Sequence, residues 1–232
     1  MVNTMKPLTL NGLVPPDDFP AADFEAVQIK LATYDKNPAH KNFVGAWSAI
    51  SYRYMAVAEY DQHLTASFST QPGAGHPIRY QQERDLFGFF RSGLSVFDAF
   101  CFGSFAIGAM TGSTDFPFAT ERDEQKVNFK SLIAAYKKSF ATYPIVPVLV
   151  GIDSDPAIDR LRYVRNILTH RATPPRQFNL AVSSTTPTTA TARIDRLNLA
   201  LDKNTTGPWR DEFKDLLAGG MAGIRAFVDA RL

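Results

Sequence analysis

Hydrophobic residues recur every three or four positions along most of this chain, which is the spacing of one face of a helix. The pattern predicts helices over residues 23–34, 41–68, 78–110, 121–140 and 208–232. The third of these is apolar around most of its circumference, as expected for a central helix. Because each glycine in a helix lowers its propensity by about 1 kcal/mol, Gly93, Gly103 and Gly108 predict places where another backbone comes close.

Three other segments depart from this pattern. The first twenty residues contain four prolines and predict an irregular arm. Residues 143–152 hold two prolines among aliphatic residues, so they are either extended or a short helix started by proline. Within residues 177–206 the helical period is lost, and hydrophobic residues alternate with others at 178–182 and, less cleanly, at 194–199, which predicts an exposed β-hairpin or a long ordered loop. The sequence therefore predicts an all-α fold in one domain over residues 21–232, with an arm (1–20) and a small extended insertion (177–206).

A strong helix start follows the proline-containing segment. Asp155 is a capping residue, and Pro156 occupies the first helical position, where its missing N–H costs nothing. The helix is expected to run to about Arg171 and to stop before Pro174. Its core face is predicted to consist of Ala157, Leu161, Val164 and Leu168.

Positive charge is concentrated at the end of this helix. The 232 residues carry a net charge of only +2, so any contact with nucleic acid must come from local clustering. Residues 160–176 hold five arginines, one histidine and no carboxylate, and they are the clear candidate. The single cysteine, Cys101, excludes an intrachain disulfide and a cysteine-rich zinc site. It lies in an apolar run and is expected to be a buried, inert thiol.

The most informative motif is Arg165-Asn166-Ile167-Leu168-Thr169-His170. Asn166 and His170 are four positions apart, so the amide can orient the imidazole. Arg165 and His170 are five apart, about 140° around an ideal helix, so one helix does not aim both at a single atom. The objection weakens if two copies of the helix face each other across a two-fold axis. The structural alternative is a helix end at which Asn166 and His170 cap the helix and face solvent.

An arginine, a polar residue and a histidine at this spacing resemble the motif of the HEPN superfamily of helical domains. The resemblance implies an antiparallel helical bundle that forms a homodimer, with the motif helices at the interface and a composite cleft between them. It also implies RNA as a substrate, no cofactor, and regulation by a possible inhibitory protein partner. HEPN toxins commonly carry a tyrosine two places after the histidine, where this chain has Ala172.

The chemistry that fits these residues is metal-independent RNA cleavage, in a defence or stress response. His170 would transfer the proton, Arg165 would stabilise the phosphate charge, and Asn166 would orient the histidine. Arg162, Tyr163 and Arg171 are the expected substrate-binding residues. The alternative function is a non-catalytic HEPN-like module that binds RNA or a nucleotide, or acts as a scaffold.

Two further features are expected to be structural. Glu59 and His63 are four positions apart, a spacing that can hold a metal, but a solvated face explains them better and no metal site is predicted. Residues 86–110 are long and apolar enough to suggest a membrane span, yet Arg91 and Asp98 would be costly in hydrocarbon. A buried helix, no membrane association and a cytoplasmic location are therefore expected.

Overall fold

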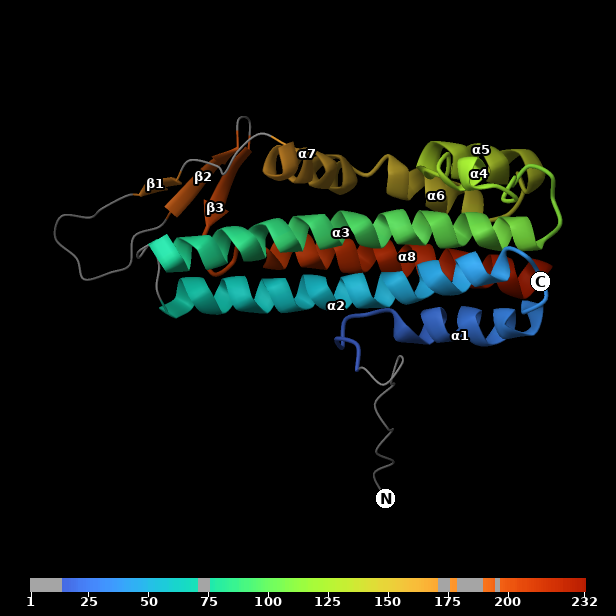
Figure 1. The fold of residues 1–232 in the computed structure, drawn as a ribbon, viewed down its shortest axis with the longest axis horizontal. Coiled ribbons are helices and arrows are strands. Elements are labelled where there is room, and N and C mark those ends of the chain that lie inside the picture. Colours follow the sequence, from blue (N-terminus) through green and yellow to red (C-terminus); the bar gives the residue numbers. More distant parts are fainter. Residues whose placement is uncertain (1–13, 71–75, 171–175, 179–189, 195–196) are drawn as a thin grey trace, which may run out of the picture. The chain divides into compact units, whose positions relative to one another are not determined.

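The computed structural model describes residues 14–70, 76–170, 176–178, 190–194 and 197–232, and these form an all-α helical bundle with a small sheet (Figure 1). Its α-helices are α1 (Ala21–Leu31), α2 (His40–Thr70), α3 (His76–Met110), α4 (Glu121–Glu124), α5 (Phe129–Ser139), α6 (Ile145–Asp153), α7 (Pro156–His170) and α8 (Gly207–Arg231). A 3₁₀ turn, η1 (Ala32–Tyr34), extends α1. The predicted all-α fold class is confirmed.

The chain divides into two compact units, each built from separated stretches of sequence. Unit 1 comprises Met1–Met55, Val96–Ser154 and Lys214–Leu232; unit 2 comprises Ala56–Ser95 and Asp155–Phe213. Helices α2, α3 and α8 contribute residues to both units. No single cut in the chain separates the units, and the expectation of one domain over residues 21–232 stays a prediction.

The predicted arm lies partly outside the described residues, which begin at Val14. Residues 14–20 contain no helix or strand, in keeping with their prolines. Phe19 is nevertheless buried, and its ring lies 5.2 Å from that of Phe24 and 5.4 Å from that of Tyr54. The last residues before α1 therefore take part in the core of unit 1.

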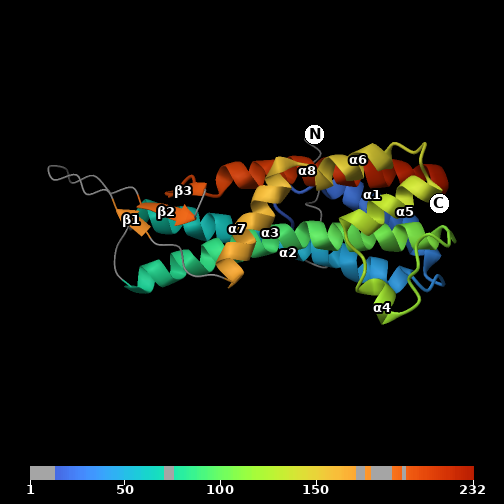
Figure 2. The same cartoon turned by 90° about the horizontal axis from the view of Figure 1, so that it is seen from above.

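Unit 1 is packed around aromatic rings. The ring of Phe227 in α8 lies 4.9 Å from that of Phe140 and 5.1 Å from that of Tyr136 in α5. The Tyr136 hydroxyl donates a hydrogen bond of 3.0 Å to the carbonyl of Ser104 in α3, and burial raises the pKa of this tyrosine well above its ordinary value. A Cβ at Gly223 of α8 would lie 3.1 Å from the side chains of Ile145 and Val148, so α6 packs closely against α8 (Figure 2). Aromatic rings thus form much of the core of unit 1.

The predicted helix over residues 121–140 is wrong, because it is two helices. Thr120 caps α4 and Asn128 caps α5, each in a reciprocal capping box. The Asn128 side chain accepts a 3.0 Å bond from the Ser131 N–H, and the Ser131 hydroxyl accepts one of 3.0 Å from the Asn128 N–H. Asn128 is extended and satisfies the free N–H groups of a new helix, so the backbone restarts there instead of continuing.

The segment over residues 143–152, left open between two conformations, is the proline-started helix α6. Pro144 is its N-cap residue, and Pro147 falls in its first turn. The N–H groups of a first turn have no partner within the helix, so a proline there removes no hydrogen bond.

In unit 2 the segment before α8 forms a three-stranded antiparallel sheet. Its strands are β1 (Arg176–Phe178), β2 (Ala190–Ile194) and β3 (Leu197–Leu201), in the order β1-β2-β3. Strands β2 and β3 are a hairpin, with Ala190 opposite Leu201. Leu199 and Leu201 are buried while Ala200 is exposed, the alternation of a half-buried strand. Strands β2 and β3 agree with the hairpin alternative, while residues 179–189 and 195–196 of the predicted insertion lie outside the described residues.

The glycines of α3 mark close packing against aromatic rings. A Cβ at Gly93 would lie 2.7 Å from the ring of Phe213, and one at Gly108 would collide with the ring of Phe116. Gly103 faces the indole of Trp47 in the same way. The expectation that another backbone approaches these glycines is wrong, because large rings take that space.

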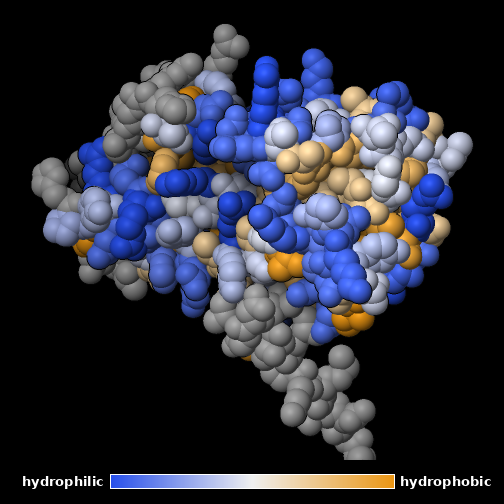
Figure 3. Space-filling view, turned by 45° about the vertical axis from the view of Figure 1, so that its right-hand side comes forward, coloured by the Kyte–Doolittle hydropathy of each residue, from blue (hydrophilic) through white to orange (hydrophobic). Residues whose placement is uncertain are grey.

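The apolar part of α3 is mostly inside the protein. Among the described residues, Pro77–Met110 is long and apolar enough to cross a membrane, and 78% of its most apolar window is buried. Cys101, within it, is a buried free thiol, as expected. Figure 3 shows one face of the molecule, on which hydrophilic residues are interspersed with smaller apolar areas.

Candidate functional site on helix α7

Helix α7 begins as its sequence predicts. The side chain of Asp155 accepts a 2.8 Å hydrogen bond from the N–H of Ala157, and Pro156 is the first helical residue. This cap satisfies a free N–H group of the first turn. The described part of the helix runs to His170, and the predicted end at Arg171 lies outside the described residues.

The apolar face of α7 is buried in unit 2. Ala157, Leu161 and Val164 are at most 3% exposed, as predicted. Leu168 is only half-buried, whereas Ile158 and Ile167 are buried, so the apolar face is wider than predicted. Figures 1 and 2 both place α7 over the part of α3 that belongs to unit 2.

Two of the arginines on α7 are held by carboxylates. Arg160 donates two hydrogen bonds of 2.9 Å to Glu212 of α8, and its guanidinium lies 5.6 Å from the ring of Trp209. Arg162 pairs with Asp159 at 3.2 Å within the helix. Arg160 therefore anchors α7 to α8, and Arg162, a predicted substrate-binding residue, already has an acidic neighbour.

The third arginine on α7, Arg165, has different surroundings. Arg165 is half-buried, and within the described part of the chain it has no ion pair or hydrogen bond from its side chain. Asn166 beside it is exposed, and Tyr163 is half-buried. A guanidinium without a carboxylate keeps all five donors for an anion, which suits phosphate recognition.

The structure describes the side chains of four of the six predicted site residues. Arg162, Tyr163, Arg165 and Asn166 lie on consecutive turns of α7. His170 is the last residue of that helix, but its side chain is not among those described, and Arg171 lies outside the described residues. The five-residue separation of Arg165 and His170 on one continuous helix leaves the 140° objection to a single-chain site in force.

A second basic and aromatic surface in unit 2 was missed by sequence reasoning. Tyr80, Arg84, Phe87 and Arg91 follow one another at spacings of four, three and four on α3, which places them along one line of the helix. Tyr80 is 68% exposed, and the guanidinium of Arg91 lies 5.9 Å from the ring of Phe87. The alternation of aromatic residues with arginines was the available signal in the sequence. We name these four residues the α3 stripe.

One arginine of the α3 stripe also has a structural contact. Arg84 donates hydrogen bonds of 2.8 and 2.7 Å to the carboxylate of Asp85, which is 2% exposed. Hydrogen bonding to Asp85 raises the pKa of Arg84 above its ordinary value, so the guanidinium stays charged at every physiological pH. About half of its side chain remains open to solvent.

The acidic and histidine residues of α2 have separate surroundings. Asp61 accepts hydrogen bonds from the Thr206 hydroxyl, at 2.5 Å, and from Arg210, at 3.1 Å. Glu59 and His63 are exposed. Within the described residues, no three His, Cys, Asp or Glu side chains gather as metal ligands would. Asp61 thus has a structural role, because it holds two residues at the start of α8.

The fold and the α7 surface define an all-α helical bundle with a candidate anion-binding site. Comparison with protein-family models, with curated proteins and with solved structures finds no match for this chain.

Proposed function

We propose that this protein is a metal-independent endoribonuclease whose site is formed by the α7 helices of two copies of the chain. Arg165 binds the scissile phosphate, Asn166 orients the histidine, and His170 transfers the proton. Arg162, Tyr163 and Arg171 contact the RNA around the cleaved bond.

The observation that carries the proposal is the state of Arg165. Arginine side chains on a helix are ordinarily neutralised or solvated, and Arg160 and Arg162 have carboxylate partners. Arg165 has none among the described residues and is half-buried at the edge of the apolar face of α7. A half-buried guanidinium without a carboxylate keeps its donors for water or for a bound anion. A phosphodiester supplies that anion with the geometry that a guanidinium prefers.

The need for a second copy follows from helical geometry. Five positions separate Arg165 from His170, about 140° around an ideal helix, so one chain does not aim both residues at one phosphate. A two-fold axis beside α7 brings Arg165 of one chain toward His170 of the other, and it does so twice.

The α3 stripe supports a single-stranded nucleic acid as the ligand. Unpaired bases stack on aromatic side chains, while arginines contact the backbone between them. Tyr80 and Phe87 alternate with Arg84 and Arg91 over three helical turns in the same unit as α7. A double helix offers no exposed base faces to such a surface.

The proposed reaction balances without a metal. One His170 takes the proton of the ribose 2′-hydroxyl, whose oxygen forms a bond to phosphorus while the bond to the 5′-oxygen breaks. The imidazolium formed in this way gives its proton to the leaving oxygen, and Arg165 stabilises the charge on the phosphoryl oxygens. The products are a 2′,3′-cyclic phosphate and a 5′-hydroxyl, so DNA is resistant.

The test is cleavage of an end-labelled single-stranded RNA in excess EDTA by the wild-type protein, Arg165→Ala and His170→Ala. Arg122→Ala, an exposed arginine of α4 in unit 1, is the matched control. We expect cyclic-phosphate ends from wild type and Arg122→Ala, and a loss of about 100-fold or more in both site variants.

Two outcomes would overturn the proposal. Equal cleavage by wild type and His170→Ala would place the activity elsewhere or in a contaminant. RNA binding without cleavage by the wild-type protein would favour the second candidate, a non-catalytic RNA-binding module, which the α3 stripe supports by itself.

A further inference from the structure

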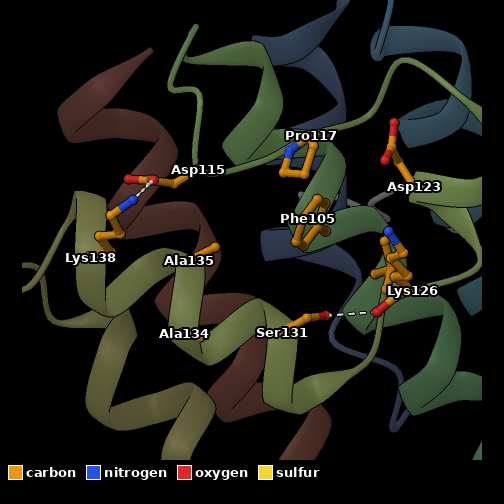
Figure 4. A pocket seen from close by; sticks show the side chains of 10 residues that line it. Phe105, Asp115, Pro117, Asp123, Lys126, Ser131, Ala134, Ala135 and Lys138 are labelled. Carbon is orange, nitrogen blue, oxygen red and sulfur yellow. Dashed lines mark hydrogen bonds and ion pairs between the residues drawn. The ribbon is translucent and has the colours of Figure 1, made fainter.

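Unit 1 contains a pocket of about 360 Å³ between α3, α5 and the segment that carries α4. Phe105 and Ala135, both buried, form its floor, and Val127, Pro117 and Ala134 form its walls. Figure 4 shows charged residues at both sides of this floor, Asp115 with Lys138 on one side and Asp123 with Lys126 on the other. An apolar floor with few polar groups is typical of a small-molecule site, and the volume falls in the usual range.

Both carboxylates of the pocket already have hydrogen-bond donors. Asp115 accepts from the Lys138 ammonium at 2.5 Å and from the Ser139 hydroxyl at 2.6 Å, and these bonds hold its pKa below its usual value. Asp123 accepts from the hydroxyl of Thr120 at 2.7 Å and from its N–H at 3.1 Å, with the same effect on its pKa. The two carboxylates thus remain ionised and are used within the protein.

Lys126 is different from the other charged residues of the pocket. Its ammonium makes no hydrogen bond or ion pair within the described part of the chain, although Asp123 lies near it. The pocket lining carries two lysines and two carboxylates, and Lys126 is the one of these four whose charged group has no hydrogen bond or ion pair among the described residues. The pocket therefore offers a cation with free donors beside an apolar floor.

We propose that this pocket binds a small amphiphilic anion, with an aromatic or aliphatic body on the Phe105 floor and an anionic group on Lys126. Phe105 presents an aromatic surface that is itself packed on Phe116 at 5.1 Å and Phe118 at 5.8 Å. These contacts fix the floor before a ligand arrives, which lowers the entropy cost of binding. The site lies wholly in unit 1 and does not depend on RNA cleavage.

The test uses two fluorescent probes of nearly the same shape. 8-Anilinonaphthalene-1-sulfonate carries an anionic group, and N-phenyl-1-naphthylamine lacks it. Ala134→Phe fills the pocket from an exposed position on α5, and Lys126→Gln removes the cation while keeping length and polarity. Lys130→Gln is the matched control, an exposed lysine outside the pocket lining.

We expect saturable binding of the sulfonate to the wild-type protein and to Lys130→Gln. Lys126→Gln should weaken that binding about fivefold to tenfold and leave the uncharged probe unaffected. Ala134→Phe should abolish binding of both probes. Ala134→Leu, a smaller change with good helix propensity, replaces it if near-UV circular dichroism shows that the phenylalanine variant is misfolded.

Three outcomes would overturn the proposal. These are no binding of the sulfonate to wild type, equal binding to wild type and the folded pocket-filling variant, or equal loss in Lys126→Gln and Lys130→Gln. Loss of RNA cleavage has no bearing on any of them, so failure here and failure of the ribonuclease proposal are distinguishable.

Discussion

The two ends of α8 are held in different ways. Its C-terminal part, in unit 1, buries Phe227 among Tyr136, Phe140 and Tyr143, with ring centroids 4.9–5.4 Å apart. The N-terminal part, in unit 2, also packs aromatic rings, but it is tied by charge: Arg210 to Asp61 and Glu212 to Arg160. Helix α8 is therefore held by aromatic packing in unit 1, and by both aromatic packing and ion pairs in unit 2.

The two kinds of contact contribute differently to stability. Aromatic burial is worth several kcal/mol per side chain and gives unit 1 its stability. The Arg160–Glu212 pair is 40% and 45% exposed, so it contributes about 0–1 kcal/mol and mainly fixes where α7 lies. The outer face of α7 is thus free to carry chemistry, because the helix does not rely on that face for packing.

The largest expected effect concerns that outer face and the second copy of the chain. Arg165→Ala and His170→Ala are each expected to be inactive alone, but a mixture of them should recover about a quarter of the wild-type cleavage rate. Half of the randomly assorted dimers are mixed, and one of the two sites in each mixed dimer has both residues. The measurement is the cleavage rate after subunit exchange, with dimer formation followed by light scattering.

A mixture that stays inactive although the dimers exchange would contradict independent cross-chain sites. A monomer that cleaves RNA would contradict them more directly, since one α7 helix cannot direct both residues to one phosphate.

The second largest effect is expected in the aromatic core of unit 1. Phe227→Ala should lower the free energy of unfolding by about 3–5 kcal/mol, because it leaves a cavity between three rings. Urea denaturation followed by circular dichroism measures the change. Ala226→Ser, at an exposed neighbouring position, is the control and should stay within about 0.5 kcal/mol of wild type. Similar losses in both variants would show that unit 1 does not depend on its aromatic cluster.

The sequence predicted most helices of both units because apolar periodicity reports burial directly. It failed between α4 and α5, where the local exchange of hydrogen bonds between Asn128 and Ser131 overrides the period. The prediction for the glycines of α3 was also wrong. Helix propensity indicates that a small residue is required there, but it does not tell which neighbouring group takes the space. The ring of Phe213 comes from a segment 120 positions away.

Only the part of the candidate site that lies on helix α7 could be predicted from the sequence. Helical spacing predicted the buried positions of Ala157, Leu161 and Val164, and these agree with the structure. The carboxylate partner of Arg160 is Glu212, 52 residues later, and no local pattern indicates it. The pocket in unit 1 has linings from α3, α4, α5 and two loops, so only the folded chain assembles it.

A smaller effect is expected from the charged side of the comparison. Asp61 is 15% exposed and holds both Thr206 and Arg210, so Asp61→Ala should cost about 1–3 kcal/mol. Thermal melting gives the difference, with Glu59→Ala, an exposed carboxylate two positions earlier, as the control. If both variants melt alike, the ion pairs at this end of α8 do not position it.

The smallest effect lies in the pH dependence of unit 1. The bonds from Lys138 and Ser139 lower the pKa of Asp115 below its ordinary 3.8, so the unfolded chain takes up this proton more readily than the folded one. The resulting stability is present above about pH 4 and is lost as the pH falls through the lowered folded-state pKa. Asp115→Asn should therefore melt slightly below wild type at pH 7, and this difference in melting temperature should narrow toward pH 2.5.

Lys138→Gln removes the main cause of the lowered Asp115 pKa, so its melting temperature should also approach that of wild type toward pH 2.5. Asp123 keeps its own bonds from Thr120, so some acid sensitivity persists in both variants. A gap that stays constant with pH would assign the effect of Asp115 to its shape and not to its charge.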